Sequence, residues 1–231
     1  ALGNSISTPL KGLIGEIAQF DTLDKLSNAD EQAVTGKIVF ISKRMIAYKD
    51  GKDYGATVGA RVNGANVASS KDAIAIIIRS VGTDNNRTPH TGVMRYKKNI
   101  TKIPAVALSN PDADLLLREL HRGKKVTMQL NVKTAFTKKF TSYNVLAEVT
   151  GSKYPDEIVL LGAHLDSWDL GTGAVDDGAG VAIVCGIVGV GRVSPAFDGR
   201  VGDAAAGGTR PTQLQPDRFL TGAALISWAR L

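Results

Sequence analysis

The stretch VLLGAHLDSWDLGTGAVDDGAGVAI, residues 159–183, sets one histidine and four aspartates into an otherwise apolar, glycine-rich segment. Its first part belongs to the run 158–167, which is apolar enough to be a buried strand. Alternate residues of a strand share a face, so His164 and Asp166 project to the same side. Because α/β sheets bind ligands at the carboxyl ends of their strands, the stretch predicts a polar site at such an end.

The residue types in this stretch suit a metal ion. One imidazole nitrogen can bind the ion while a neighbouring carboxylate orients the other nitrogen. Asp176, twelve residues after His164, could return to the same ion and share a second one, as in two-metal hydrolysis. A structural interpretation is also open, with Asp177 as a helix N-cap and Asp166 in a turn with Ser167. Spacing alone does not decide between the two.

Upstream, apolar runs bounded by Gly, Pro, Asn and Asp alternate with helical segments, which predicts an α/β or α+β module. The expected strands are 36–42, 72–82, 103–109 and 125–132. Residues 110–123 predict a helix, because Pro111 marks its start and Gly123 follows a basic last turn.

A second unit begins near residue 142. The runs 142–151 and 158–167 predict two strands that form a hairpin or an adjacent pair, because a short polar turn containing Pro155 joins them.

Composition excludes several classes of protein. A chain of 231 residues, 43% hydrophobic and 22% charged, is typical of one large globular domain or two small ones. The net charge is +6, yet the lysines are scattered in pairs and only 6% of residues are aromatic, so no nucleic-acid partner is expected. The longest apolar run, 179–190, is well short of the roughly 20 residues that span a bilayer, so no membrane partner is expected either.

The other two histidines favour structural roles, and the single cysteine limits the sites that the chain can form. Cys185 is the only cysteine, which excludes an intrachain disulfide and zinc-finger spacing. His121 lies in the last turn of the predicted helix, where it complements the helix dipole, and His90 lies in a turn-like loop.

The composition changes abruptly towards the C-terminus. No glutamate follows Glu157 and no lysine follows Lys153, while Arg, Ala, Gly and Pro become frequent in the final fifty residues, from 182 on. The change is typical of a linker and tail, and a shifted reading frame would give the same composition.

The segment GAHLDSWDLGTGAVDDGAG resembles the zinc-site motif of the dizinc exopeptidases, in particular those of the carboxypeptidase Q (plasma glutamate carboxypeptidase) type. The resemblance extends over 20–183 and includes IIIRSVG, TPHTG, KIPAVAL and NVLAEVTGSKYPDE. It implies an α/β fold with a protease-associated-like insert domain followed by the first part of a mixed-sheet dizinc exopeptidase domain. The expected divisions are an N-terminal segment 1–33, the protease-associated-like domain 34–134, the start of the catalytic domain 135–183 and a divergent tail 184–231.

The resemblance also implies a role for each motif residue. His164 is expected to bind one zinc ion, Asp166 to orient His164, and Asp176 to bridge two zinc ions. In relatives the peptide bond joining the aspartate pair is commonly cis, which here is the bond between Asp176 and Asp177.

The expected activity is that of a zinc exopeptidase, of carboxypeptidase or aminopeptidase type, acting on small peptides or dipeptides. Members of the family are extracellular, periplasmic or lysosomal, and a homodimer is left open. The alternative is a non-catalytic protein-binding module derived from a peptidase.

Downstream of the aspartate pair, the family pattern continues with a helix, a strand ending in Glu-Glu, an aspartate and a second histidine. Here no glutamate follows Glu157 and no histidine follows His164, so the general base is missing and the chain is expected to be an incomplete, inactive peptidase. Three aspartates remain, in contexts unlike the family pattern: Asp198, Asp203 and Asp217. The expected helix is also weakened by three glycines that each cost about 1 kcal/mol in a helix interior: Gly186, Gly189 and Gly191.

Overall fold

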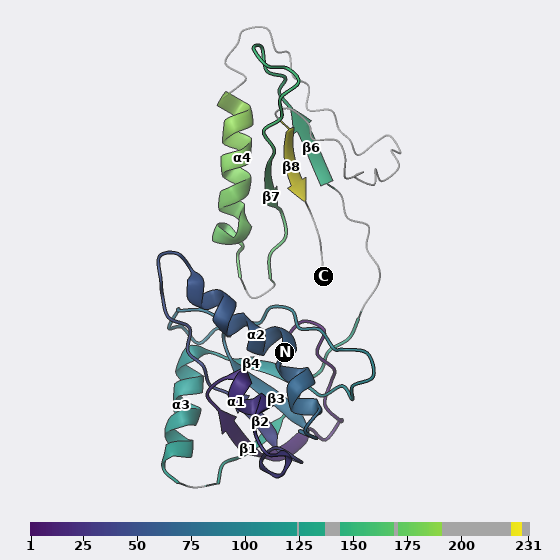
Figure 1. Ribbon diagram of the computed structural model, residues 1–231, viewed down its shortest axis with the longest axis vertical. Coiled ribbons are helices and arrows are strands. Elements are labelled where there is room, and N and C mark those ends of the chain that lie inside the picture. Colours follow the sequence, from purple (N-terminus) through teal and green to yellow (C-terminus); the bar gives the residue numbers. More distant parts are fainter. Residues whose placement is uncertain (124, 137–143, 169–170, 191–222, 228–231) are drawn as a thin grey trace. The chain divides into compact units, whose positions relative to one another are not determined.

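The computed structural model describes residues 1–123, 125–136, 144–168, 171–190 and 223–227 (Figure 1). The chain forms two compact units, Ala1–Thr137 and Lys138–Leu231, which are described separately below.

The first unit is built on a five-stranded sheet with strand order β4-β3-β2-β1-β5. Its strands are β1 (Leu13–Phe20), β2 (Ile38–Ile41), β3 (Ala75–Arg79), β4 (Ala105–Leu108) and β5 (Thr127–Leu130). The first four run parallel, and β5 pairs antiparallel with β1. Every residue of β2 and β3 is buried, as expected for strands covered on both faces.

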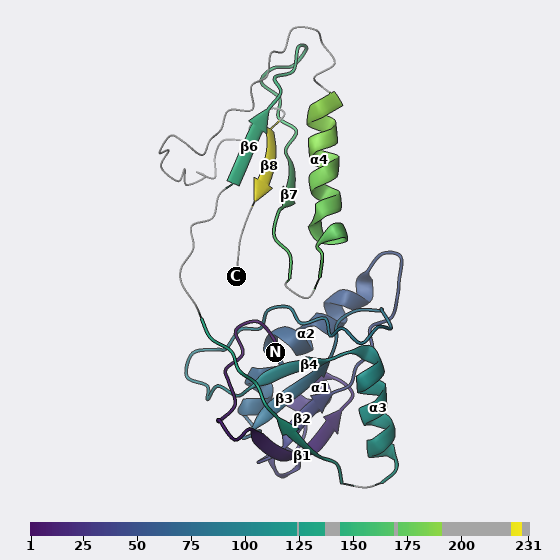
Figure 2. The same cartoon turned by 180° about the vertical axis from the view of Figure 1, so that it is seen from behind.

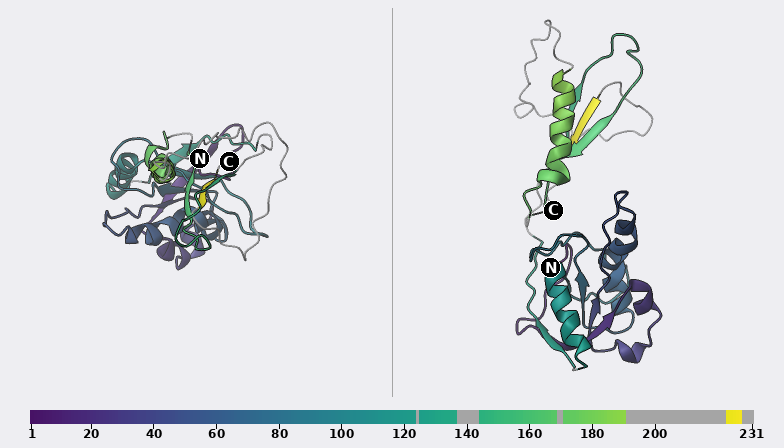
Figure 3. Two further views of the ribbon diagram at one scale, coloured as in Figure 1. Left: turned by 90° about the horizontal axis from the view of Figure 1, so that it is seen from above. Right: turned by 90° about the vertical axis from the view of Figure 1, so that its left-hand side faces the viewer.

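Helices cover both faces of this sheet (Figure 3). They are α1 (Leu23–Ser27), α2 (Lys52–Ser69) and α3 (Asn110–His121), and a short 3-10 turn, η1 (Glu31–Ala33), follows α1. Leu26 of α1 and Ala65 of α2 pack with Ile76 on one face. Leu116 of α3 packs with Phe40 on the other face. The unit therefore has three layers and two apolar cores.

The strands predicted upstream and the helix 110–123 are confirmed as β2 to β5 and α3. The hydroxyl of Ser109 caps α3 by accepting a hydrogen bond from the Asp112 N–H. The structure adds β1, which the sequence analysis did not predict, within the segment 1–33. Gly15 and Glu16 interrupt the alternation of apolar and polar residues in this strand. That segment packs in the same unit as the rest of the sheet, because β1 pairs with both β2 and β5.

The sequence also gave no sign of α2, an 18-residue helix with three interior glycines and almost no amphipathic pattern. Packing against the sheet explains one of these glycines, Gly64, since a Cβ there would lie 2.8 Å from Cδ1 of Ile76. The glycine lets α2 approach the sheet closely, and this need outweighs its poor helix propensity.

The second unit contains a three-stranded sheet with strand order β6-β8-β7. Its strands are β6 (Asn144–Glu148), β7 (Leu161–His164) and β8 (Ala223–Ser227), with β8 antiparallel to β6 and parallel to β7. The predicted hairpin or adjacent pair of β6 and β7 is wrong, because β8 lies between them. A segment of the tail that the sequence analysis treated as divergent therefore supplies the middle strand.

Helix α4 (Ala179–Val190) runs alongside β7 (Figure 2). Val184 of α4 and Ala163 of β7 are buried against each other, with Leu161 and Val181 beside them. The helix continues through Gly186 and Gly189, contrary to the weakening expected from these residues, and Gly191 lies outside the described residues. Although α4 has no charged residue, none of the described helices is both long and apolar enough to cross a membrane.

Candidate metal centre

The predicted site residues lie where β7 ends and α4 begins. His164 is the last residue of β7, and Asp166 follows two residues later. The chain then returns through the turn η2 (Ala174–Gly178), where Asp176 and Asp177 have non-helical backbone angles. The peptide bond between these two aspartates is cis, as the resemblance predicted.

The imidazole of His164 lies between two carboxylates. Its Nδ1 is 3.0 Å from the backbone carbonyl of Asp166 and 3.1 Å from Oδ1 of the same residue. Its Nε2 is 2.9 Å from Oδ1 of Asp176. The structure thus brings together the three residues that the motif singled out, and it places each aspartate on a different ring nitrogen.

This geometry assigns the protons of the ring. A carbonyl and a carboxylate only accept hydrogen bonds, so the Nδ1 of His164 donates to Asp166. Its Nε2 also faces an acceptor, which favours a second proton on that nitrogen. Burial lowers the pKa of His164, but hydrogen bonds to the Asp166 carbonyl and the Asp176 carboxylate outweigh this effect and raise the pKa. The negative charges of Asp166 and Asp176 favour a positive charge at the His164 ring. Either a proton or a metal ion at Nε2 supplies such a charge.

Asp177 has a place in the site that the sequence analysis did not foresee. Its Oδ2 accepts a hydrogen bond from the backbone N–H of His164 at 3.1 Å. The sequence analysis considered Asp177 only as an N-cap of α4. The sequence carries no distinct signal for this contact, and the structure explains the nearby Gly180, because a Cβ at that position would lie 2.2 Å from Oδ1 of Asp177.

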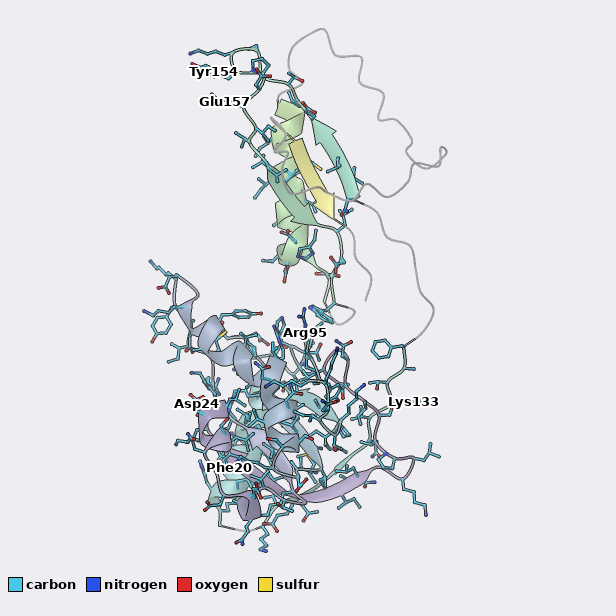
Figure 4. All side chains as sticks on the ribbon, turned by 45° about the vertical axis from the view of Figure 1, so that its right-hand side comes forward. Phe20, Asp24, Arg95, Lys133, Tyr154 and Glu157 are labelled. Carbon is cyan, nitrogen blue, oxygen red and sulfur yellow. The ribbon has the colours of Figure 1, made fainter. Side chains whose placement is uncertain are left out.

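The structure places the last glutamate of the chain away from this site. Glu157 lies in the connection between β6 and β7, where its N–H donates to the carbonyl of Tyr154 (Figure 4). That connection precedes β7, whereas His164 ends it, so Glu157 is at the opposite end of the strand. Within the described part of the chain, no group of three or more His, Cys, Asp and Glu side chains could hold a metal ion. The three tail aspartates lie outside the described residues: Asp198, Asp203 and Asp217.

The other two histidines lie in the first unit, and both are exposed. His121 is the last residue of α3, as predicted. The backbone N–H of His90 donates to the hydroxyl of Ser80 at 2.8 Å.

Comparison with known proteins gives matches that span both units. The sequence model of peptidase family M28 matches residues 144–192. Carboxypeptidase Q from Xenopus laevis is 39% identical over 182 residues, and carboxypeptidase Q from Homo sapiens is 38% identical over the same length. Each alignment covers 79% of this chain and 37% of the relative. The crystal structure of a Peptidase M28 precursor from Shewanella amazonensis SB2B superposes with a TM-score of 0.80 and 45% identity, covering 99% of this chain and 47% of that one.

These matches define the class: residues 144–192 match peptidase family M28, and the predicted resemblance to peptidases of the carboxypeptidase Q type is confirmed. The chain is a homologue of carboxypeptidase Q and spans 37% of the length of these relatives. The family match includes the whole of η2 and α4, so it runs past residue 183, where the sequence analysis ended the resemblance.

Proposed function

We propose that the end of β7 is part of the zinc site of an M28 exopeptidase, with His164 and Asp176 as zinc ligands and Asp166 as the residue that orients the imidazole. The observation that carries this proposal is the 2.9 Å approach of the His164 Nε2 to the Asp176 Oδ1, while Asp166 occupies Nδ1. Imidazole nitrogen and carboxylate oxygen are ligands that zinc commonly takes in peptidases.

Each residue has a separate task in the proposed site. Asp166 holds the proton on Nδ1 of His164, so the lone pair of Nε2 is free for a metal ion once that nitrogen loses its proton. The side chain of Asp176 is 80% exposed, so its second oxygen is accessible to a further ion, as the bridging role in a two-zinc site requires. When bound, zinc polarises a peptide carbonyl and lowers the pKa of a water molecule. The substrate class of the complete site is a small peptide or dipeptide.

The 231-residue chain is proposed to lack peptidase turnover. A general base near the metal is needed to take a proton from the attacking water. Since Glu157 is the last glutamate of the chain and lies at the far end of β7, it does not meet this need. We expect no chelator-sensitive hydrolysis of dipeptides by the purified chain. Hydrolysis that disappears both with a chelator and in His164→Ala would overturn this part of the proposal.

Zinc affinity tests the proposed ligands directly. Competition against a chromophoric chelator is measured for the wild-type chain and for His164→Ala and Asp176→Asn. Each substitution is expected to weaken zinc binding by at least about tenfold. Because the chain has three histidines, His90→Ala and His121→Ala are matched controls that should bind as the wild type does. Equal affinity in all five proteins would reject the site.

A second candidate, a non-catalytic protein-binding module, is favoured by the apolar side chains exposed in the second unit. Val159 is 68% exposed, and Val145 and Ile183 are more than half exposed. Partner binding that is unaffected by a chelator, together with no zinc binding, would favour this function over the first. For the first unit, we propose the role of the protease-associated-like domain of the same family.

A further inference from the structure

Asp177 holds the main chain of the proposed zinc ligand, and Gly180 gives it room to do so. We propose that Asp177 is a positioning residue for His164, and that Gly180 is required because it leaves space for the Asp177 carboxylate. The proposal rests on the metal role proposed above for His164 and concerns two residues that this role does not use.

The first observation is the hydrogen bond between the backbone N–H of His164 and the Oδ2 of Asp177, at 3.1 Å. In the described sheet, β7 has a strand partner on one side only, since β8 is its sole neighbour. The carboxylate therefore supplies an acceptor where no strand does. An acceptor oxygen at this position satisfies the His164 N–H, so the contact fixes the end of β7 more firmly than a turn alone would.

The second observation is the space at Gly180, in the first turn of α4. A Cβ at this position would lie 2.2 Å from the Oδ1 of Asp177 and 2.7 Å from its Cγ. Both distances are far below van der Waals contact, so alanine here forces the carboxylate to move. Gly186 of the same helix is different, because a Cβ there meets nothing within 4 Å.

The third observation is that Asp176 and Asp177 act on the same histidine from adjacent positions. The Oδ1 of Asp176 lies 2.9 Å from the ring Nε2, while Asp177 holds the backbone N–H. The ring and the main chain of His164 are thus tied to one dipeptide. A shift of Asp177 therefore changes the placement of both proposed zinc ligands. Mutation of residues that orient metal ligands typically weakens metal binding about 10- to 100-fold.

Four substitutions in the full 231-residue chain test the proposal. Asp177→Ala removes the acceptor, and Asp177→Asn retains an acceptor oxygen at the same place. Gly180→Ala displaces the carboxylate without changing Asp177 itself. Gly186→Ala is the matched control, because it adds the same methyl group to the same helix in open space.

Three quantities are measured on each variant: hydrogen exchange of the His164 amide without metal, affinity for Zn²⁺, and the thermal midpoint of unfolding. Asp177→Ala and Gly180→Ala are expected to lose protection of the His164 amide and to bind Zn²⁺ about tenfold more weakly. Asp177→Asn and Gly186→Ala are expected to stay within about threefold of the wild type in both quantities. A merely structural role would lower the thermal midpoint and leave Zn²⁺ affinity unchanged.

The proposal is overturned if the His164 amide stays protected in Asp177→Ala, if Gly180→Ala matches Gly186→Ala, or if Zn²⁺ affinity is insensitive to Asp177→Ala. If the wild-type chain binds no Zn²⁺, the proposed function fails separately. Hydrogen exchange of the metal-free proteins then decides the positioning role. It stands if Asp177→Ala and Gly180→Ala both lose protection of the His164 amide, and it falls otherwise.

Discussion

The two units of this chain differ in how much apolar surface they bury. In the first unit, Ile38, Phe40 and Ile77 are 0% exposed, and helices cover both faces of the sheet. Among residues 144–168 and 171–187 of the second unit, the buried hydrophobic residues are Ala163 and Val184, and all of β6 is exposed. The candidate metal centre lies in the second unit. We therefore expect stability and the proposed chemistry to be carried by different parts of the chain, and the following experiments test this expectation.

The largest effect is expected from Phe40→Ala in the core between β2 and α3. Removing a fully buried phenylalanine side chain leaves a cavity and should reduce the free energy of unfolding of the first unit by about 3–5 kcal/mol. Phe136→Ala is the matched control, because Phe136 is 86% exposed. That control should change stability by less than about 0.5 kcal/mol in denaturant titrations. Similar losses in both variants would show that the described core does not carry the stability.

A smaller loss is expected when the buried Arg79 loses its acidic partner. The guanidinium of Arg79 donates to Asp114 at 2.8 Å and to the carbonyl of Ser42, and Arg44 also contacts Asp114. Asp114→Ala should destabilise the first unit by about 1.5–3 kcal/mol, because it leaves a buried charge with fewer hydrogen bonds. Glu119→Gln removes an exposed ion pair and should cost no more than about 0.5 kcal/mol. An Asp114 variant as stable as the Glu119 variant would contradict this account.

The Asp114 carboxylate should also make the stability of the first unit depend on pH in the acidic range. Burial raises the pKa of Asp114, but hydrogen bonds from Arg44 and Arg79 outweigh it, so the pKa lies below its ordinary value. A lowered pKa in the folded state stabilises the protein above the ordinary pKa of the carboxyl, and this stabilisation is lost as the pH falls through the folded pKa. Unfolding midpoints measured from about pH 6 to about pH 2 should therefore fall less steeply for Asp114→Asn than for the wild type. Parallel curves would show that Asp114 does not contribute to this dependence.

The smallest stability effect is expected in the second unit. Val184→Ala removes two methyl groups from the contact with Ala163 and should cost about 1.5 kcal/mol locally. Faster amide exchange in α4, with unchanged exchange in β2 and β3, is the expected result. Val175→Ala, at a residue that is 84% exposed, should leave exchange unchanged. If Val184→Ala instead unfolded both units together, the division between them would be wrong.

The sequence revealed the elements whose signals are local. The β-branched runs of β2 and β3 and the marked ends of α3 predicted those elements, because propensity, capping and burial agree there. It did not reveal β1, where Gly15 and Glu16 interrupt the apolar pattern, or α2, whose glycines serve close packing. The position of β8 between β6 and β7 depends on pairing between distant residues, which no local pattern encodes.

The candidate site was predictable to a similar extent. Residue types and spacing made His164, Asp166 and Asp176 candidates, and the family resemblance supplied their expected roles; the structure brings the three side chains together. The contact between Asp177 and the His164 N–H was missed because it depends on the backbone angles of η2. The sequence shows Gly180, but only the structure shows that this glycine leaves room for the Asp177 carboxylate.

The most direct test of the central claim is the X-ray absorption spectrum of Zn²⁺ bound to the full chain. The wild type is expected to show one imidazole ligand and oxygen ligands at about 2.0–2.2 Å. The imidazole signal should vanish in His164→Ala and persist in His90→Ala and His121→Ala. If the imidazole signal persists in His164→Ala, or if the wild type shows none, then His164 is not a zinc ligand and the proposed centre is wrong.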